Sequence, residues 1–498
     1  MLVWLVALNL LASIGIGLFA ATRVHNTKDF AVAGRHLPLP VVIATVFATW
    51  FGAEAVFGVS ATFVKDGLGG VVADPFGASL CLIIAGFFFT AFLYKLNIIT
   101  LGDYYRMRYN RTVEVLTTIC IVVSYLGWVA AQVKALGLVF YVVTEGAISQ
   151  EWGMVLGMAI VLTYTTFGGM LSVAILDFVQ MLMIMVGLLF IGWIVADKVG
   201  GVGPVIAHAS QAGKLDFFPP PDAMQWLAFI GTGMTMMLGS VPQQDVFQRI
   251  TSAKSGRIAI WGSVIGALTY FCFAFIPMFI AYSATLVEPG LFNSLLENDS
   301  QMVLPTLVLS GHVPLLAQAL FFGAVLSAIM STASATLLAP SVSFSENILR
   351  DFFPHMTDRG VLRAMRISLF VFALCVLIFA LKSSAGIFQM VESAYKITLV
   401  GAFVPLFAGA LWKRASTQGA LFAIGGGISS WLLIEILVGE ASAVPPQLIG
   451  FCCSLAGMIL GSLMPQWVGR PTPREDAHTA LHHRAASETH HTAGHEPF

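Results

Sequence analysis

The sequence predicts an all-α polytopic membrane protein with about thirteen transmembrane helices. Of its 498 residues, 57% are hydrophobic and only 10% are charged, whereas about 25% of an ordinary soluble protein is charged. The mean hydropathy is +0.86, and apolar segments of membrane-spanning length recur along the whole chain. A soluble fold of this length could not cover its surface with so few charges. We therefore expect lipid to be the main solvent, which excludes secreted, cytosolic and nucleic-acid-binding proteins.

The net charge, the cysteines and the sequence motifs narrow the class of protein further. The formal net charge of −1 gives no basic surface for a polyanion. The six cysteines lie inside apolar stretches without a CxxC or Cys/His spacing, which favours small buried side chains over a metal site. Neither HExxH nor GxSxG occurs in the apolar segments, so the sequence does not predict an enzyme.

Thirteen segments are apolar and long enough to cross a bilayer, which requires about 20 residues. In chain order they are 2–21, 39–63, 76–94, 113–143, 152–165, 172–196, 224–243, 258–283, 314–340, 364–381, 387–411, 418–437 and 447–466. The first has no basic residues before it, and its positive charges follow it, so we expect a retained helix rather than a signal peptide.

The distribution of positive charges tests this count. With the N-terminus outside, the predicted inside loops and tail hold nineteen Lys and Arg, Arg249 among them, and the outside loops hold four. Cytoplasmic loops carry the excess of Lys and Arg in membrane proteins. The asymmetry therefore predicts a multi-pass protein of the plasma (inner) membrane, with its N-terminus outside and its C-terminus cytoplasmic.

Two of the apolar segments contain residues that interrupt a helix. Residues 48–58 place Glu54 and two glycines in the middle of the second span, and residues 231–244 place three glycines and a proline in the seventh. Broken helices at matching positions of two halves are typical of transporters built from inverted repeats. Their freed carbonyls can coordinate a cation or orient a polar solute. The alternative, ordinary helix kinks, stays open from these residues alone.

The ninth and sixth spans add polar side chains at membrane depth. Ala328, Ser331 and Thr332 share one helix face, and hydroxyls beside a carbonyl suit a hard cation such as sodium. The alternative is that these hydroxyls only join helices. Asp177 lies just inside an apolar span with Gln180 three residues later. A carboxylate there needs a cation or a donor, so its role is either functional or structural.

Three motifs in this order resemble the sodium:solute symporter family: FGGMLSVAILDFVQ, VPQQDVFQR and AIMSTASATLL. The resemblance extends over about residues 1–466. It implies thirteen helices with an outside N-terminus, around a LeuT-like core of five-plus-five inverted repeats with broken helices. It also implies that sodium (Na+) is the coupling ion, bound between the second and ninth helices.

On this resemblance we divide the chain into five parts. They are an extra N-terminal helix and first inside loop (1–38), a first inverted repeat (39–196), a second inverted repeat (224–411), two C-terminal helices (412–466) and a disordered cytoplasmic tail (467–498). The tail holds six of the eleven histidines. Metal binding by this tail is the alternative to disorder.

The family's main sodium site, carried over to this chain, uses carbonyls and hydroxyls. They are the main-chain carbonyls of Ala48, Phe51 and Ala328 and the side chains of Ser331 and Thr332. Some members have a second ion site, to which Asp177, Ser331 and Ser334 correspond. One further hydroxyl of that second site is replaced here by Ala335.

Among the branches of the family, the choline transporters resemble this chain most, through ATWFG, GWVAAQVKALG and PQQDVFQR. Their pocket is an aromatic box, because a quaternary ammonium is best held by ring faces. Trp50 and Trp128 are kept here, whereas Gln243 and Ala78 replace two aromatic residues of that box. We therefore do not expect choline itself.

The polar residues around this incomplete box define the predicted solute pocket. Its members are Trp50, Glu54, Trp128, Gln132 and Gln243, with Asp74 and Gln244 as further polar groups. Glutamines donate and accept, which suits an amino acid, amide or polyol, and the carboxylates suit an amine. We predict a sodium-coupled symporter that imports a small polar organic solute by alternating access. A transporter-like solute sensor with little net flux is the alternative.

Overall fold

The computed structural model describes residues 1–310, 313–353, 355–439, 442 and 444–468. Among these residues the secondary structure is helical, apart from an isolated bridge between Leu37 and Ala253. The described part is thus the all-α protein that the sequence predicts. Most of the predicted His-rich tail, residues 469–498, lies outside the described residues.

The helices of the first half include several short 3-10 and π segments, labelled η. They are α1 (Leu2–Ala21), α2 (Thr27–Val32), η1 (Ala33–Arg35), α3 (Leu39–Trp50), η2 (Glu54–Gly58), α4 (Val59–Asp66), η3 (Leu68–Val71), η4 (Val72–Gly77), α5 (Ala78–Ile84), η5 (Ala85–Phe89), α6 (Thr90–Lys95), α7 (Leu101–Arg108), α8 (Arg111–Val143), α9 (Gln150–Lys198) and α10 (Val202–Gln211).

The second half begins with α11 and ends with two helices that pack on each other. Its elements are α11 (Ala223–Gly239), α12 (Gln244–Ser252), α13 (Gly256–Val287), α14 (Pro289–Asn298), η6 (Ser300–Met302), α15 (Val303–Leu309), α16 (Leu315–Phe344), η7 (Ser345–Leu349), α17 (Arg350–Phe352), α18 (Asp358–Lys382), α19 (Ile387–Thr398), η8 (Leu399–Phe403), α20 (Val404–Leu411), α21 (Thr417–Leu437) and α22 (Pro446–Leu463).

The described residues contain ten helices long and apolar enough to cross a membrane, or eleven with the bent pair α3 and η2–α4. The predicted spans 152–165 and 172–196 both lie in α9, whose 49 residues would extend for about 74 Å. That length is more than twice the ~30 Å hydrocarbon core. Gly169, with φ of 50°, interrupts this helix between the two predicted spans. The predicted span 224–243 corresponds to α11, which has only 17 residues. Thirteen crossings remain a prediction.

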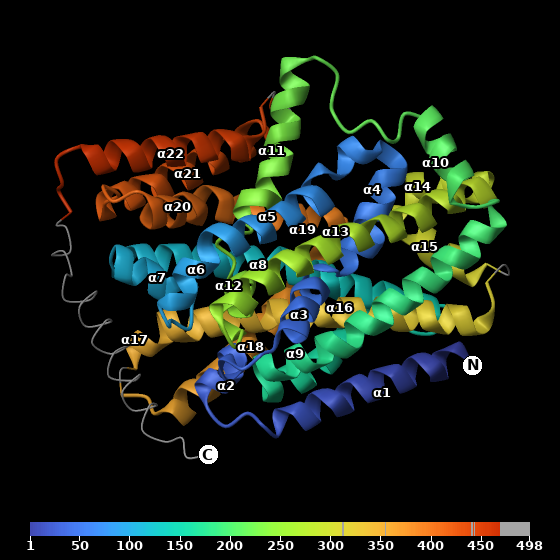
Figure 1. Ribbon diagram of the computed structural model, residues 1–498, viewed down its shortest axis with the longest axis horizontal. Helices are drawn as coiled ribbons and strands as arrows, with labels where there is room; N and C mark the ends of the chain where they lie inside the picture. The colour runs from blue at the N-terminus through green and yellow to red at the C-terminus, as the bar shows by residue number, and fades with distance from the viewer. Residues whose placement is uncertain (311–312, 354, 440–441, 443, 469–498) are drawn as a thin grey trace.

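Most of the long helices lie side by side (Figure 1), and how deeply each is buried follows its place in this bundle. Helix α16 is buried along most of its length, between α9, α8, α3 and α18, whereas α1 and α21 expose most of their surface. Helices α7 and α17 lie at one end of the molecule, and α10, α14 and α15 lie at the other (Figure 1). A central helix that is apolar on all sides is expected to be buried in the core.

The predicted breaks are confirmed in the second span and shifted in the seventh. Helix α3 ends at Trp50, and the chain bends by 55° before it continues as η2 and α4. Helix α11 runs unbroken to Gly239, so the interruption is confined to residues 240–243. Gly231 lies inside the helix without breaking it. The absence of a side chain there allows close packing, since a Cβ at Gly231 would lie 2.8 Å from Pro445. A third break, at Asp74, was not predicted from the sequence, and the backbone there is not helical.

Candidate cation and solute site

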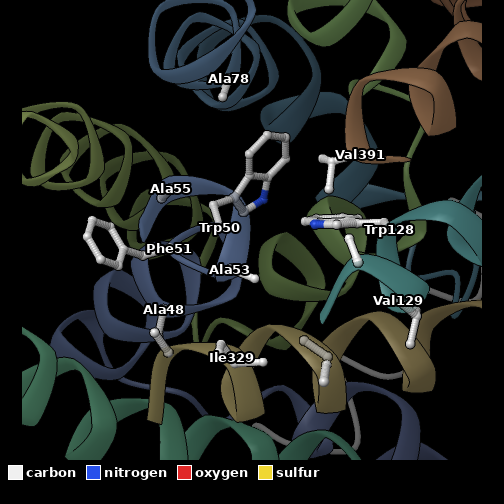
Figure 2. Close-up of a cluster of buried hydrophobic side chains, with 14 of the residues drawn as sticks. Ala48, Trp50, Phe51, Ala53, Ala55, Ala78, Trp128, Val129, Ile329 and Val391 are labelled. Atoms are coloured by element: carbon white, nitrogen blue, oxygen red, sulfur yellow. The ribbon is translucent and has the colours of Figure 1, made fainter. Parts of the chain in front are cut away.

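The end of α3 lies against the middle of α16. Because α3 stops at Trp50, the carbonyls of its last turn lose the amide donors that a continuing helix provides. The Thr332 hydroxyl donates to the Ala48 carbonyl at 3.3 Å, and Figure 2 shows Ala48 facing the Ile329 region of α16. All five predicted sodium ligands, Ala48, Phe51, Ala328, Ser331 and Thr332, are buried. Uncharged oxygens in this arrangement fit the donor set that a hard monovalent cation needs.

Asp177, on α9, is joined to both of these helices. Its carboxylate accepts a hydrogen bond from the Ser331 hydroxyl at 2.5 Å and another from the Thr45 hydroxyl. A hydroxyl whose proton is held by a carboxylate keeps its lone pairs for a cation. Ser334 instead donates to the main-chain carbonyl of Ser331 at 2.9 Å. The structure therefore brings Asp177 to the first predicted ion site, and no hydrogen bond joins Ser334 to Asp177 among the described residues.

Arg249 is not the loop cation that the charge count assumed. It lies on α12, is only 1% exposed, and is among the largest fully buried side chains. Its guanidinium donates twice to the Thr49 hydroxyl, at 2.8 and 3.1 Å, and once to the main-chain carbonyl of Asp245 at 2.9 Å. Residues 244–252 form the helix α12, which packs against α13 and α16. Arg249, which hydropathy assigns to a loop, is therefore buried by tertiary contacts.

Three aromatic rings meet beside the break in α3. Trp50 and Trp128 are in edge contact, with centroids 5.6 Å apart, and Tyr395 of α19 lies 6.2 Å from Trp50 and 5.4 Å from Trp128. Figure 2 shows the two indoles on facing helices, with Val391 next to Trp128 and Ala78 beyond Trp50. Tyr395 was not predicted from the sequence, because a single tyrosine in an apolar span has no distinguishing pattern. We call these three residues the aromatic cage.

Glu54 lies at one side of the aromatic cage. Its carboxylate accepts a hydrogen bond from the indole N–H of Trp128 at 2.8 Å and another from the side-chain amide of Gln132 at 2.6 Å. The Gln132 oxygen in turn accepts from the main-chain N–H of Ala53 at 2.9 Å. Both donors to Glu54 are neutral. A buried carboxylate in this setting still favours a cation.

The sodium ligands and the solute pocket come together at Gly52. A Cβ on this glycine would lie 2.6 Å from the Thr332 hydroxyl oxygen, 2.7 Å from a Glu54 carboxylate oxygen and 2.8 Å from the Gln132 amide oxygen. Three oxygens from α16, η2 and α8 therefore surround one point of the break. Only a residue without a side chain leaves this arrangement undisturbed.

The two predicted pocket glutamines have different positions. Gln243 donates to Ser124 at 2.9 Å and, less closely, to Thr398 at 3.4 Å, which places it on the α8 and α19 side of the site. Gln244 accepts from the Leu101 amide at 2.9 Å and donates to the Ile99 carbonyl at 3.2 Å. Its amide is used to hold the start of α7, so we leave Gln244 out of the proposed pocket.

Asp74 is held in the same core by Tyr270 of α13. Its carboxylate accepts the Tyr270 hydroxyl, and the Tyr270 ring packs edge-on against Phe51 at 6.1 Å. Main-chain carbonyls, hydroxyls and buried carboxylates thus converge between helices of a membrane bundle. This combination defines the class of the molecule, a cation-coupled membrane transporter with broken helices.

The family is shown by comparison with known proteins. The model of the sodium:solute symporter family matches residues 30–427, and the chain belongs to this family. The sodium ion is therefore its coupling ion, and the protein is a transporter rather than an enzyme. The resemblance drawn from the three sequence motifs is confirmed.

Similar proteins of known function are also transporters. The chain is 27% identical over 449 residues to the human high affinity choline transporter 1, a match that covers 85% of this chain and 74% of that protein. It is 27% identical over 439 residues to the high-affinity choline transporter 1 of Torpedo marmorata (84% and 73% covered). It is 26% identical over 466 residues to the human sodium/iodide cotransporter (89% and 70% covered).

Solved structures share the fold. A Na+-coupled sialic acid symporter in a substrate-bound outward-open state superposes with a TM-score of 0.78 at 19% identity, covering 93% of this chain and 97% of that one. Mhp1, a nucleobase-cation-symport-1 family transporter, gives a TM-score of 0.57 at 14% identity, with 87% and 94% covered. The LeuT-like five-plus-five architecture is thus confirmed.

Proposed function

We propose that this protein imports a small organic solute with a positively charged nitrogen, together with sodium, by alternating access. The observation that carries the proposal is the meeting of Thr332, Glu54 and Gln132 at Gly52. A sodium ligand and a solute ligand on either side of one helix break allow each bound species to favour the same conformation. That shared preference is what coupling requires.

The charge of the pocket supports a cationic solute. Glu54 is 2% exposed, and its hydrogen-bond donors are the neutral side chains of Trp128 and Gln132. A carboxylate at membrane depth without a cation costs about 2.5–3.5 kcal/mol on insertion scales. An ammonium group beside Glu54 and over the faces of Trp50 and Tyr395 would remove that cost, and each desolvated ring face adds about 1–2 kcal/mol.

In this proposal the sodium ion joins α3 to α16. Its ligands are the carbonyls of Ala48, Phe51 and Ala328 and the hydroxyls of Ser331 and Thr332. Asp177 positions the Ser331 hydroxyl rather than binding a second ion, which agrees with Ala335 at the place of a further hydroxyl. We keep Ser334 as a packing residue of α16.

Transport then follows from two related halves of the chain. Residues 39–196 and 224–411 form the inverted repeats, and sodium and solute bind where their broken helices meet. We place the N-terminus outside. The membrane potential contributes about 2.3 kcal/mol per 100 mV for each positive charge that moves into the cytoplasm. A cationic solute moving with sodium is therefore concentrated inside.

The choline transporters among the similar proteins support an organic cation, but the pocket of this chain differs from an aromatic box. Gln243 holds Ser124 instead of adding a ring, Ala78 adds none, and Glu54 supplies a full negative charge. A carboxylate with hydrogen-bonding capacity favours an ammonium that carries N–H donors over a quaternary one.

The test is uptake by the purified full-length protein in proteoliposomes. Radiolabelled primary amines, choline, neutral polyols and amino acids are offered with and without an inward sodium gradient, and current is recorded with each. We expect amine uptake that needs sodium and carries inward positive charge. Glu54→Gln, which keeps the size and loses the charge, should reduce amine uptake at least tenfold while sodium binding to the detergent-solubilised protein persists.

Three results would contradict the proposal. Uptake of neutral solutes only would contradict a cationic solute. Equal uptake by the Glu54→Gln variant would contradict a role of the Glu54 carboxylate in binding the solute. Sodium-dependent binding of amines without flux would instead support the sensor that the sequence left as the alternative.

A further inference from the structure

A second carboxylate lies beside Tyr125, whose ring stacks on Trp128 of the aromatic cage. Asp245, on α12, is fully buried, and one of its oxygens accepts the Tyr125 hydroxyl. Its other oxygen, Oδ2, is buried without a hydrogen-bond partner. Leaving a charged oxygen unsatisfied costs more free energy than leaving a neutral one unsatisfied. Such an atom in a binding region indicates a ligand that supplies the missing donor.

The rings of α8 link this carboxylate to Glu54. Tyr125 and Trp128 are one helical turn apart and stack at 6.0 Å with an interplanar angle of 14°. Trp128 donates to Glu54 at its end of this stack, and Tyr125 donates to Asp245 at the other. A continuous aromatic surface therefore has a buried carboxylate at each end.

Further unpartnered atoms lie along the same surface. The Tyr395 hydroxyl and the Trp50 indole nitrogen are buried without hydrogen-bond partners, and both residues are in ring contact with Trp128 or with each other. Tyr395 thus adds a buried hydroxyl to the ring surface formed by Trp50 and Trp128. Polar atoms at several points of one apolar surface suit a long solute that has more than one polar group.

Arg249 does not satisfy Asp245, although it lies one turn away on the same helix. Its N–H groups donate to the Thr49 hydroxyl and to the main-chain carbonyl of Asp245. The Asp245 carboxylate oxygen thus stays free in spite of the neighbouring guanidinium.

The described part of the membrane core holds more buried acids than buried bases. Its buried carboxylates are Glu54, Asp74, Asp177 and Asp245, and its buried base is Arg249. A second cationic group on the solute would reduce this imbalance, which a low-dielectric site favours.

We propose that the solute is a linear organic dication with two amino groups, one held at Glu54 and the other at Asp245, with its alkyl chain over the aromatic cage. This inference rests on the proposed function and narrows it to a substrate class. An alkyl chain between two ammonium groups matches an apolar ring surface between two carboxylates.

The test compares diamines with monoamines on the purified full-length protein in detergent. Ligand-induced shifts in melting temperature are measured in NaCl and in KCl for 1,4-diaminobutane, 1,6-diaminohexane, 1-aminobutane and 1-aminohexane, and dissociation constants are derived from the concentration dependence. In sodium, we expect at least one diamine to bind at least tenfold more tightly than the monoamine of equal chain length. Asp245→Asn should remove that tenfold preference.

A matched control is Asp103→Asn, at an aspartate that lies on α7 outside the core and is also hydrogen-bonded. It should keep the diamine preference even if the melting temperature falls. Sodium-dependent binding of monoamines with no gain from a second amino group, in the parent protein, overturns this inference and leaves the proposed function intact. Absence of sodium-dependent binding for every amine overturns both. The parent comparison decides the matter even where Asp245→Asn does not fold.

Discussion

Acidic side chains gather in two regions of the described part of the molecule, which we call the end cluster and the membrane core. In the end cluster, where α7 meets the start of α8 and the segment η7–α17, Glu114, Glu346 and Asp351 each pair with an arginine. Glu114 pairs with Arg111 at 2.9 Å, and Asp351 pairs with Arg111 at 2.8 Å and with Arg106 at 3.2 Å. These are the distances of ordinary charge-assisted pairs.

The same end cluster contains a neutral linker. Asn347 donates to Asp103 and to Glu114, both at 3.0 Å, so α16 is tied to α7 and α8 through η7. Burial raises the pKa of Asp103, and its hydrogen bonds to the Thr100 and Ile99 amides act in the opposite direction. A cavity of about 280 Å³ lies among these side chains. The cluster holds three segments together.

The membrane core has the opposite balance. Four carboxylates share one arginine there, and their hydrogen bonds come from neutral hydroxyl, indole and amide groups. Acidic side chains therefore have different roles in the two regions. Acids that have fixed cations stabilise the structure, whereas acids that lack them favour cations that arrive and leave.

Gly52→Ala should have the largest effect and test the core most directly. The backbone of Gly52 is compatible with alanine, but the added Cβ would meet the oxygens of Thr332, Glu54 and Gln132 within 2.8 Å. We expect both sodium binding and solute uptake to be lost, measured by radioactive sodium binding and by proteoliposome uptake. Gly425→Ala is the control, because a Cβ at Gly425 meets nothing within 4 Å. Normal uptake by Gly52→Ala would refute the shared site.

Ser331→Ala and Thr332→Ala should weaken sodium affinity by about tenfold each, since each removes one oxygen ligand worth about 1.4 kcal/mol. Abundance and melting temperature should change little, because α16 stays apolar and helical. The measurement is the sodium dependence of uptake. Thr163→Ala removes an exposed hydroxyl that bonds only to its own helix and should leave that dependence unchanged. Parental sodium dependence in both core variants would exclude this ion site.

Asp177→Asn should weaken sodium affinity about fivefold, less than the loss of a direct ligand. The asparagine can still accept the Ser331 proton, but the negative charge near the ion is gone. The ratio of charge to solute, from the reversal potential, should stay that of the parent. A changed ratio would show that Asp177 binds a transported ion itself.

Trp50→Ala should raise the apparent KM for the solute several-fold, because one ring face of the aromatic cage is worth about 0.5–2 kcal/mol. Sodium binding should persist. Trp193→Ala, at a residue 68% exposed on α9, is the control for losing an indole. A less stable Trp50→Ala protein with the parental KM would mean that Trp50 is only packing.

Glu114→Gln should have the smallest effect on transport and act on stability alone. It removes the charge that pairs with Arg111 and Arg106, which we expect to lower the free energy of unfolding by about 1–3 kcal/mol. The melting temperature should fall while the sodium dependence and KM of uptake stay those of the parent. A shift in sodium affinity would show that the end cluster also takes part in coupling.

The features that can be predicted from the amino-acid sequence are those that are local in the chain. Apolar length predicts the spans, because a bilayer has a fixed thickness. The break at Gly52 follows from a carboxylate and glycines inside one span, and the hydroxyl face of α16 follows from the helical period. Motifs of a few residues were enough to identify the family. None of these inferences needs to know which helices touch.

Which of these features meet depends on contacts between segments that are far apart in the chain. Thr332 reaches Ala48 across 284 residues of sequence, and Tyr395 joins two tryptophans from other helices. Arg249 and Gln244 illustrate the limit most clearly. Hydropathy assigned Arg249 to a loop, yet Arg249 is buried on α12. Gln244 was expected among the polar groups of the solute pocket, yet its amide is hydrogen-bonded at the start of α7. A polar side chain in a membrane protein is placed by the partners that satisfy it, and those partners come from distant segments.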